Sequence, residues 1–222
     1  RAGGQRTVLG RGEAERLGEA RVDLGGVADR VARLRGLGEA VLRRGRRVPE
    51  AEAEREKFID AVAAAPDSRF NSIPVPELQA LAIARKMLDG ELEYRKGNIE
   101  EAFSLLREAI ALEDTLPYSD PPAWLQPVRH AYCALLTEQG RHAEAAEQHR
   151  IDLGLERKLG RRRIRPNNVW SLHGLYECLT KLGRHDEARE IVLQRDIAVA
   201  SADIKIAAAC FCRLSAFENE AA

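Results

Sequence analysis

Hydrophobic residues recur every three or four positions along most of this chain, which is the pattern of amphipathic helices that bury one face. Several of these stretches end at a glycine, and Gly97, Gly140 and Gly183 follow one another at intervals of 43 residues. A fixed period of this size is typical of stacked helical hairpins rather than of a catalytic domain. The pattern therefore predicts an all-α solenoid built from antiparallel helix pairs.

Each of these glycines opens the same motif, Gly-x-x-x-Glu-Ala. Glycine adopts the left-handed backbone that ends a helix without a steric penalty. A glutamate in the first turn of the next helix is favoured by the helix dipole, and an alanine lets two helices approach closely. The copies are Gly97, Glu101 and Ala102, then Gly140, Glu144 and Ala145, then Gly183, Glu187 and Ala188. The motif thus predicts the turn between two antiparallel helices.

The same pattern divides the chain into four parts. Gly45 followed by Glu50 and Ala51 is the motif with one residue inserted, so it indicates a divergent first hairpin. The parts are a poorly ordered or truncated segment at 1–26, the divergent hairpin at 27–66, three hairpins at 76–200, and a capping helix at 202–217. The chain begins at Arg1 rather than methionine, so we expect it to be a fragment of a longer protein.

Proline and asparagine indicate where individual helices begin. We expect Asp120 to cap a helix that carries Pro121 in its first position, because both residue types are favoured there. We expect Asn167 or Asn168 to cap the helix that ends at Gly183. Connectors rich in proline or arginine separate the hairpins and span residues 66–76, 115–122 and 157–168.

Composition narrows the class of partner. The chain has 35 basic and 35 acidic residues, so no overall electric field attracts nucleic acid or a membrane surface. No apolar run reaches the roughly 20 residues that a membrane-spanning helix needs. Four cysteines in 222 residues do not form a disulfide framework, which favours a reducing, cytoplasmic location.

The repeats resemble those of the tetratricopeptide family, whose helix-turn-helix units are about 34 residues long. Cys133 stands at the small position before Gly140, and Ala145 and Ala188 stand at the first alanine of the second helix. Asp152 and Arg195 replace the second alanine of that family, and the period is longer. The resemblance implies a right-handed superhelix in which the first helix of each pair lines a concave groove.

Three phrases are similar to a broad group of microbial and fungal tetratricopeptide proteins. They are Pro-Pro-Ala-Trp-Leu-Gln-Pro-Val-Arg-His at 121–130, Asn-Val-Trp-Ser-Leu-His-Gly-Leu at 168–175, and Cys-Phe-Cys-Arg at 210–213. The likeness covers roughly residues 70–213. It implies a fold and no reaction.

The register of the first helices gives the candidate partner-binding residues. They are Met87, Tyr94, His130, Thr137, His173, Glu177 and Thr180. The chain has no Gly-x-Ser-x-Gly elbow, no phosphate-binding glycine loop and no His-Glu-x-x-His motif. We therefore expect a non-enzymatic scaffold that has no cofactor and that binds a protein, a peptide or a helix in its groove.

Two other functions stay open. Cys210 and Cys212 form a Cys-x-Cys pair that would suit a metal-responsive module, although small buried residues of a cap explain them better. The chain would otherwise be a helical accessory region of a larger enzyme or regulator. The metal hypothesis for the histidines is weaker, because His130 and His173 on neighbouring helices are expected about 8 to 10 Å apart.

The remaining candidates are interpreted as structural. The basic connector from Arg157 to Arg165 has no aromatic residues among its arginines, so we expect a solvated loop rather than a nucleic-acid site. Trp124 and Trp170 are each expected to open a helix and to fill the space between repeats.

Overall fold

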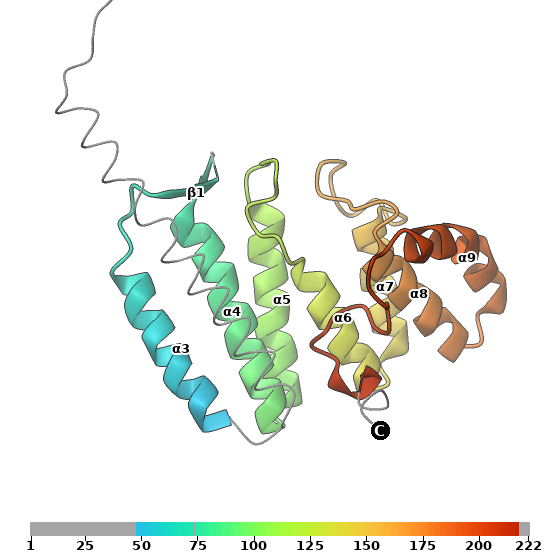
Figure 1. Ribbon diagram of the computed structural model, residues 1–222, viewed down its shortest axis with the longest axis horizontal. Helices are drawn as coiled ribbons and strands as arrows, with labels where there is room; N and C mark the ends of the chain where they lie inside the picture. Colours follow the sequence, from blue (N-terminus) through green and yellow to red (C-terminus); the bar gives the residue numbers. More distant parts are fainter. Residues whose placement is uncertain (1–47, 73, 218–222) are drawn as a thin grey trace, which may run out of the picture.

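The computed structural model describes residues 48–72 and 74–217 (Figure 1). Within these residues the chain is all-α apart from a short antiparallel strand pair, β1 (Phe70–Ser72) and β2 (Val75–Pro76). The α-helices of this part are α3 (Val48–Ala63), α4 (Glu77–Lys96), α5 (Ile99–Thr115), α6 (Val128–Glu138), α7 (His142–Leu153), α8 (Val169–Lys181) and α9 (His185–Ala200). The expected segment at 1–26 and the first helix of the divergent hairpin lie outside the described residues.

The three predicted hairpin turns are confirmed. Gly97, Gly140 and Gly183 have φ angles of 90°, 73° and 70°, in the left-handed region that favours glycine. Each glycine amide donates to the carbonyl three residues earlier, and the next amide donates to the carbonyl five residues earlier. This pair of hydrogen bonds satisfies the last carbonyls of the preceding helix and reverses the chain.

The glutamate and alanine of the motif also lie where the pattern predicts. Ala102 and Ala145 are completely buried and Ala188 nearly so, so a larger side chain would force the paired helices apart. The glutamates begin the second helices, and two of them pair with the arginine three residues earlier. These pairs are Arg141 with Glu144 and Arg184 with Glu187.

Each helix packs mainly against the helices next to it in sequence, so the helices form a row from α3 to α9 (Figure 1). An additional contact joins α6 to α8, the first helices of consecutive hairpins. One hydrophobic cluster extends from Val75 at β2 to Cys212 near the C-terminus. Inside it, the rings of Phe103 on α5 and Tyr132 on α6 meet edge to face with centroids 5.6 Å apart.

The predicted start of α6 was wrong. The helix begins at Val128, with Pro127 as its N-cap, rather than at Pro121. A helix from Pro121 would place Pro127 in its interior, where the ring lacks an amide hydrogen and clashes with the preceding turn. By contrast, the predicted cap of α8 was right, because the Asn168 side chain accepts a hydrogen bond from the Ser171 amide at 3.1 Å.

The capping helix expected over residues 202–217 does not form. The segment contains only a 3₁₀ turn, η1 (Leu214–Ala216), and is otherwise irregular. The backbone runs through bends and a turn, and its buried side chains are those of Ile206, Ala208, Ala209, Cys210 and Cys212. A helix would turn Cys210 and Cys212 to opposite sides, whereas the irregular backbone lets both be buried.

The left-handed backbone at the hairpin turns predicts that replacing a turn glycine lowers the stability of the fold. Gly140→Ala should lower the free energy of unfolding by about 1 kcal/mol, because a side chain disfavours a left-handed backbone. The added Cβ would meet no other atom within 4 Å, so the cost comes from the backbone alone. Urea unfolding measures this difference.

Gly160→Ala is the matched control, since its Cβ also meets nothing and its φ is not positive. Equal stabilities for the two variants would contradict the backbone explanation.

Candidate functional site

The name helix-A face is used here for the side of α4, α6 and α8, the first helices of the three hairpins, that the C-terminal segment contacts. The C-terminal segment, residues 202–217, returns from α9 and runs past α8 to α6 (Figure 1). On α4, the Arg95 guanidinium donates to the carbonyl oxygen of Cys212. On α6, the Ala131 carbonyl accepts the Cys212 thiol at 3.7 Å. The segment therefore contacts successive hairpins rather than only the last one.

Contacts with α8 hold the segment most specifically. Arg213 Nη1 lies 2.7 and 2.8 Å from the two carboxylate oxygens of Glu177. The ring of Phe211 meets the ring of Trp170 edge to face, with centroids 5.4 Å apart. At Gly174 a Cβ would lie 2.2 Å from Nε2 of His149 and 2.9 Å from the Cβ of Ala209, so glycine makes room for both α7 and the segment.

The structure separates the seven candidate partner-binding residues into two groups. Met87, Tyr94, His130 and Thr137 are buried, each with at most 7% of its surface exposed. The Tyr94 hydroxyl donates to Glu138 at 2.8 Å and accepts from Gln139 at 2.7 Å, while Thr137 donates to the Cys133 carbonyl at 2.8 Å. These side chains already have partners within the protein.

The other three candidates lie on α8. Glu177 pairs with Arg213 of the C-terminal segment. Burial lowers the pKa of His173, although the Glu177 carboxylate and a hydrogen bond with the Ala207 backbone oppose this shift. Thr180 is exposed, and its hydroxyl donates to the carbonyl of Tyr176 at 2.8 Å. The face thus brings Glu177 and His173 together beneath the segment.

A buried polar network lies behind this face. The Asp152 carboxylate on α7 is fully buried and accepts hydrogen bonds from Arg165 at 2.7 Å and from Ser171 at 2.8 Å. His130 Nε2 lies 3.0 Å from the same carboxylate. Burial alone would raise the pKa of Asp152. The hydrogen bonds with His130 and Ser171 and the positive charge of Arg165 outweigh this effect and hold the pKa well below its usual value.

The network extends to the end of α5. Arg165 Nη2 donates to Glu113 at 2.6 Å, and the other Glu113 oxygen accepts the Val128 amide at 3.0 Å. Burial raises the pKa of Glu113, and the positive charge of Arg165 offsets only part of that rise. Beside it, Arg129 makes a two-bond contact with Asp114 at 2.7 and 2.6 Å.

Serine, histidine and aspartate meet in this network, but their geometry does not support nucleophilic catalysis. The Ser171 hydroxyl is fully buried and donates to Asp152, so no histidine accepts its proton. His149 Nδ1 lies 3.3 Å from that hydroxyl. Burial, together with repulsion from His130, lowers the pKa of His149 to about 3, which leaves its imidazole neutral. The network has a structural role.

All four cysteines are buried and unpaired. Burial raises the pKa values of Cys133 and Cys212 well above the usual thiol value, and the Cys212 amide donates to Cys210 Sγ at 3.3 Å. Among the described residues, no three histidine, cysteine or acidic side chains group as a metal-ion site. These positions favour packing over metal capture.

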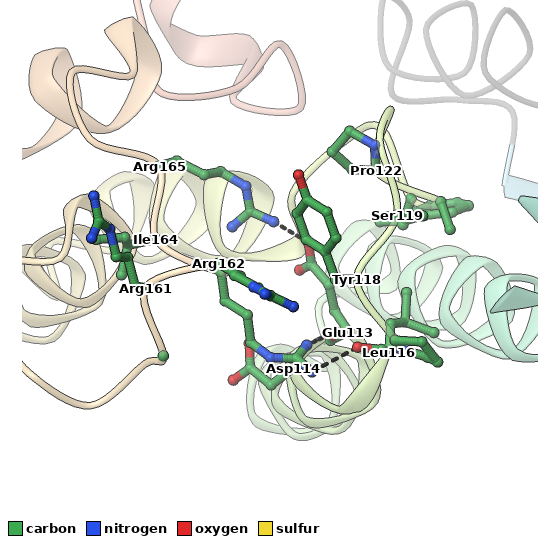
Figure 2. Close-up of a pocket in the computed structure, with 15 residues that line it drawn as sticks. Glu113, Asp114, Leu116, Tyr118, Ser119, Pro122, Arg161, Arg162, Ile164 and Arg165 are labelled. Carbon is green, nitrogen blue, oxygen red and sulfur yellow. Dashed lines mark hydrogen bonds and ion pairs between the residues drawn. The ribbon is translucent and has the colours of Figure 1, made fainter. Parts of the chain in front are cut away.

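A pocket of about 690 Å³ lies between two connectors, at the end of the hairpins opposite the glycine turns (Figure 2). One connector joins α5 to α6 and supplies Tyr118 and Trp124, and the other joins α7 to α8 and supplies a run of arginines. Arg163 donates to the carbonyls of Leu116 at 2.6 Å and Glu113 at 3.3 Å. The connectors are therefore fastened to each other.

The expectation of a solvated basic loop holds for only part of this connector. Arg161 and Arg162 are exposed, whereas Arg163 and Arg165 bond to the end of α5. The aromatic residue that the loop lacks in sequence comes from the other connector, since the Arg162 guanidinium lies 5.5 Å from the Tyr118 ring centroid. The repeat period could have indicated in the sequence that the two connectors meet. Tyr118 and Arg161 are 43 residues apart and so occupy equivalent positions in consecutive hairpins.

The chain matches no family model, no curated protein and no solved structure in the comparisons made. The likeness to tetratricopeptide repeats thus rests on the sequence pattern. In the part of the chain that the structure describes, none of the helices combines the length and the apolar character needed to span a bilayer.

The buried network predicts a pH-dependent stability. Asp152→Asn should lower the free energy of unfolding near pH 6 by about 3 kcal/mol, because it leaves Arg165 and its other partners without a buried carboxylate. The native pKa of Asp152 is lowered, so its contribution is complete above the unfolded value of about 3.9 and is lost as the pH falls towards the native value. The difference between variant and wild type should therefore shrink below about pH 4.

Urea unfolding at several pH values measures this difference. Asp186→Asn provides the control, because Asp186 forms an exposed ion pair with Arg189 and should leave stability almost unchanged. A stability loss for Asp152→Asn that is the same at every pH would contradict the linkage.

Proposed function

We propose that this chain is a non-enzymatic interaction module of helical repeats whose helix-A face binds an irregular, non-α-helical peptide. In the state described, the occupant is the chain's own C-terminal segment. The path of residues 202–217 across α4, α6 and α8 is the observation that carries the proposal. A groove formed by packed helices loses little entropy when such a segment docks.

The contacts define the chemistry of the peptide that the face accepts. Arg95 binds a main-chain carbonyl, which depends little on sequence. Glu177 selects a basic side chain, and Gly174 leaves room for a small one. Trp170 adds an aromatic contact. A competing protein would therefore present a turn-forming stretch with a small residue, an aromatic residue and a basic residue in the order of Ala209, Phe211 and Arg213.

A right-handed solenoid of tetratricopeptide type is the architecture that we propose for this module. Three identical left-handed turns and a constant 43-residue period support it. The packing of each helix against its neighbours in sequence supports it as well. Among the candidates from helix register, we retain Glu177 and His173 as binding residues because they lie nearest the occupant.

Cleavage of the connection to the C-terminal segment tests this function. A protease site placed in the exposed stretch at residues 203–205 allows the segment to be cut while the fold is intact. The cut segment should stay bound, and a labelled peptide of residues 205–217 should exchange with it saturably, as measured by fluorescence anisotropy. Glu177→Arg should weaken this binding about tenfold, because it removes a charge-assisted hydrogen bond.

Exchanging the charges of Glu177 and Arg213 distinguishes loss of their ion pair from loss of folding. A peptide with Arg213→Glu should bind Glu177→Arg better than the natural peptide does, which recovers the ion pair in reverse. Thr180→Ala is the control on the same helix, since Thr180 bonds only to α8. The proposal is wrong if the cut segment leaves, the peptide fails to bind, and circular dichroism still reports folded helices.

A further inference from the structure

The pocket between the two connectors carries positive charge that no carboxylate of the described residues neutralises. Arg165 pairs with Glu113 and Asp152, and Arg129 pairs with Asp114, so the acidic groups in the pocket wall already have partners. Arg163 donates to two carbonyls at the end of α5, which offer only the partial charge of a helix terminus. Arg162 faces the Tyr118 ring and forms no ion pair within the described part of the chain. Arg162 therefore offers its guanidinium to an anion, and Arg163 keeps the N–H donors that its two carbonyl bonds leave unused.

Aromatic surface lies beside this charge. Tyr118 is 56% exposed, and Figure 2 shows Arg162 reaching from the opposite connector towards its ring. Trp124 is half-buried in the same wall. A pocket of about 690 Å³ lies within the usual range for small-molecule sites, whereas a strand of nucleic acid needs a continuous groove.

The pocket is held in shape without a ligand. Arg163 joins the second connector to the end of α5, and the Arg165 amide donates to the Asp152 carbonyl at 2.7 Å. Ile164 packs so closely on Gly154 that a Cβ there would lie 2.7 Å from its Cδ1 atom. A site arranged in advance loses little entropy on binding, so a small ligand gains most of its contact energy.

We propose that this pocket binds a small organic anion that combines a phosphate with a planar ring, the class of nucleoside monophosphates. The phosphate would contact Arg162 and the guanidinium of Arg163, whose planar donors suit phosphate oxygens. The base would lie against Tyr118 and Trp124, since aromatic faces stack on bases. The site is separate from the helix-A face and does not depend on the peptide-binding function.

Calorimetric titration of the full chain tests the site. The probes are AMP, GMP, CMP and UMP, with inorganic phosphate and adenosine as the two partial ligands. At least one monophosphate should bind tenfold or more tightly than either partial ligand, because only the whole molecule uses both the charge and the ring. Arg162→Gln should weaken that binding at least tenfold, and Tyr118→Ala should weaken it while Tyr118→Phe retains it.

The variants at Arg162 and Tyr118 should leave the fold intact, because both side chains are exposed and contribute little to the core. Arg157→Gln is the control, since Arg157 is an exposed arginine of the same connector outside the pocket lining. No binding of any monophosphate at about 1 mM would overturn the proposal, as would equal affinity for inorganic phosphate or an unchanged affinity in Arg162→Gln.

Discussion

The middle of this structure depends on the guanidinium of Arg165, which bonds to Asp152 on α7 and to Glu113 on α5. Both carboxylates are buried, so each would carry a large desolvation cost without a positive partner. Glu113 also accepts the first amide of α6. One cation thereby links the end of α5, the start of α6 and the end of α7, and it fixes the connector that carries the pocket arginines.

The second constraint is the left-handed turn that recurs at Gly97, Gly140 and Gly183. Because the interval between turns is constant, equivalent parts of successive hairpins lie side by side. The first helices α6 and α8 consequently pack on each other, and the connectors lie at the end of the hairpins opposite the glycine turns (Figure 1), where Arg163 joins them. Both proposed binding regions arise from this repetition. What they bind depends on residues that differ between the copies, such as Glu177 and Arg162.

The C-terminal segment shows how packing overrides local preference. Its alanines favour a helix by intrinsic propensity. Its irregular backbone instead buries Ile206, Ala208, Ala209, Cys210 and Cys212, and some of its polar groups find partners on the helices. The Cys212 carbonyl accepts from Arg95, and the Ser215 amide donates to Glu138 at 3.2 Å. These contacts are made with helices that lie far from the segment in sequence.

The sequence by itself determined the helical class, the hairpin turns and the cap of α8. These features depend on local chemistry: the left-handed turn favours glycine, the spacing of apolar residues marks the buried stripe, and Asn168 bonds to an amide three residues away. Tertiary structure decided the start of α6, the path of residues 202–217, and the burial of Tyr94 and His130. It also brought Tyr118 to Arg162. Each of these depends on residues distant in sequence, whose positions follow only from how the hairpins pack.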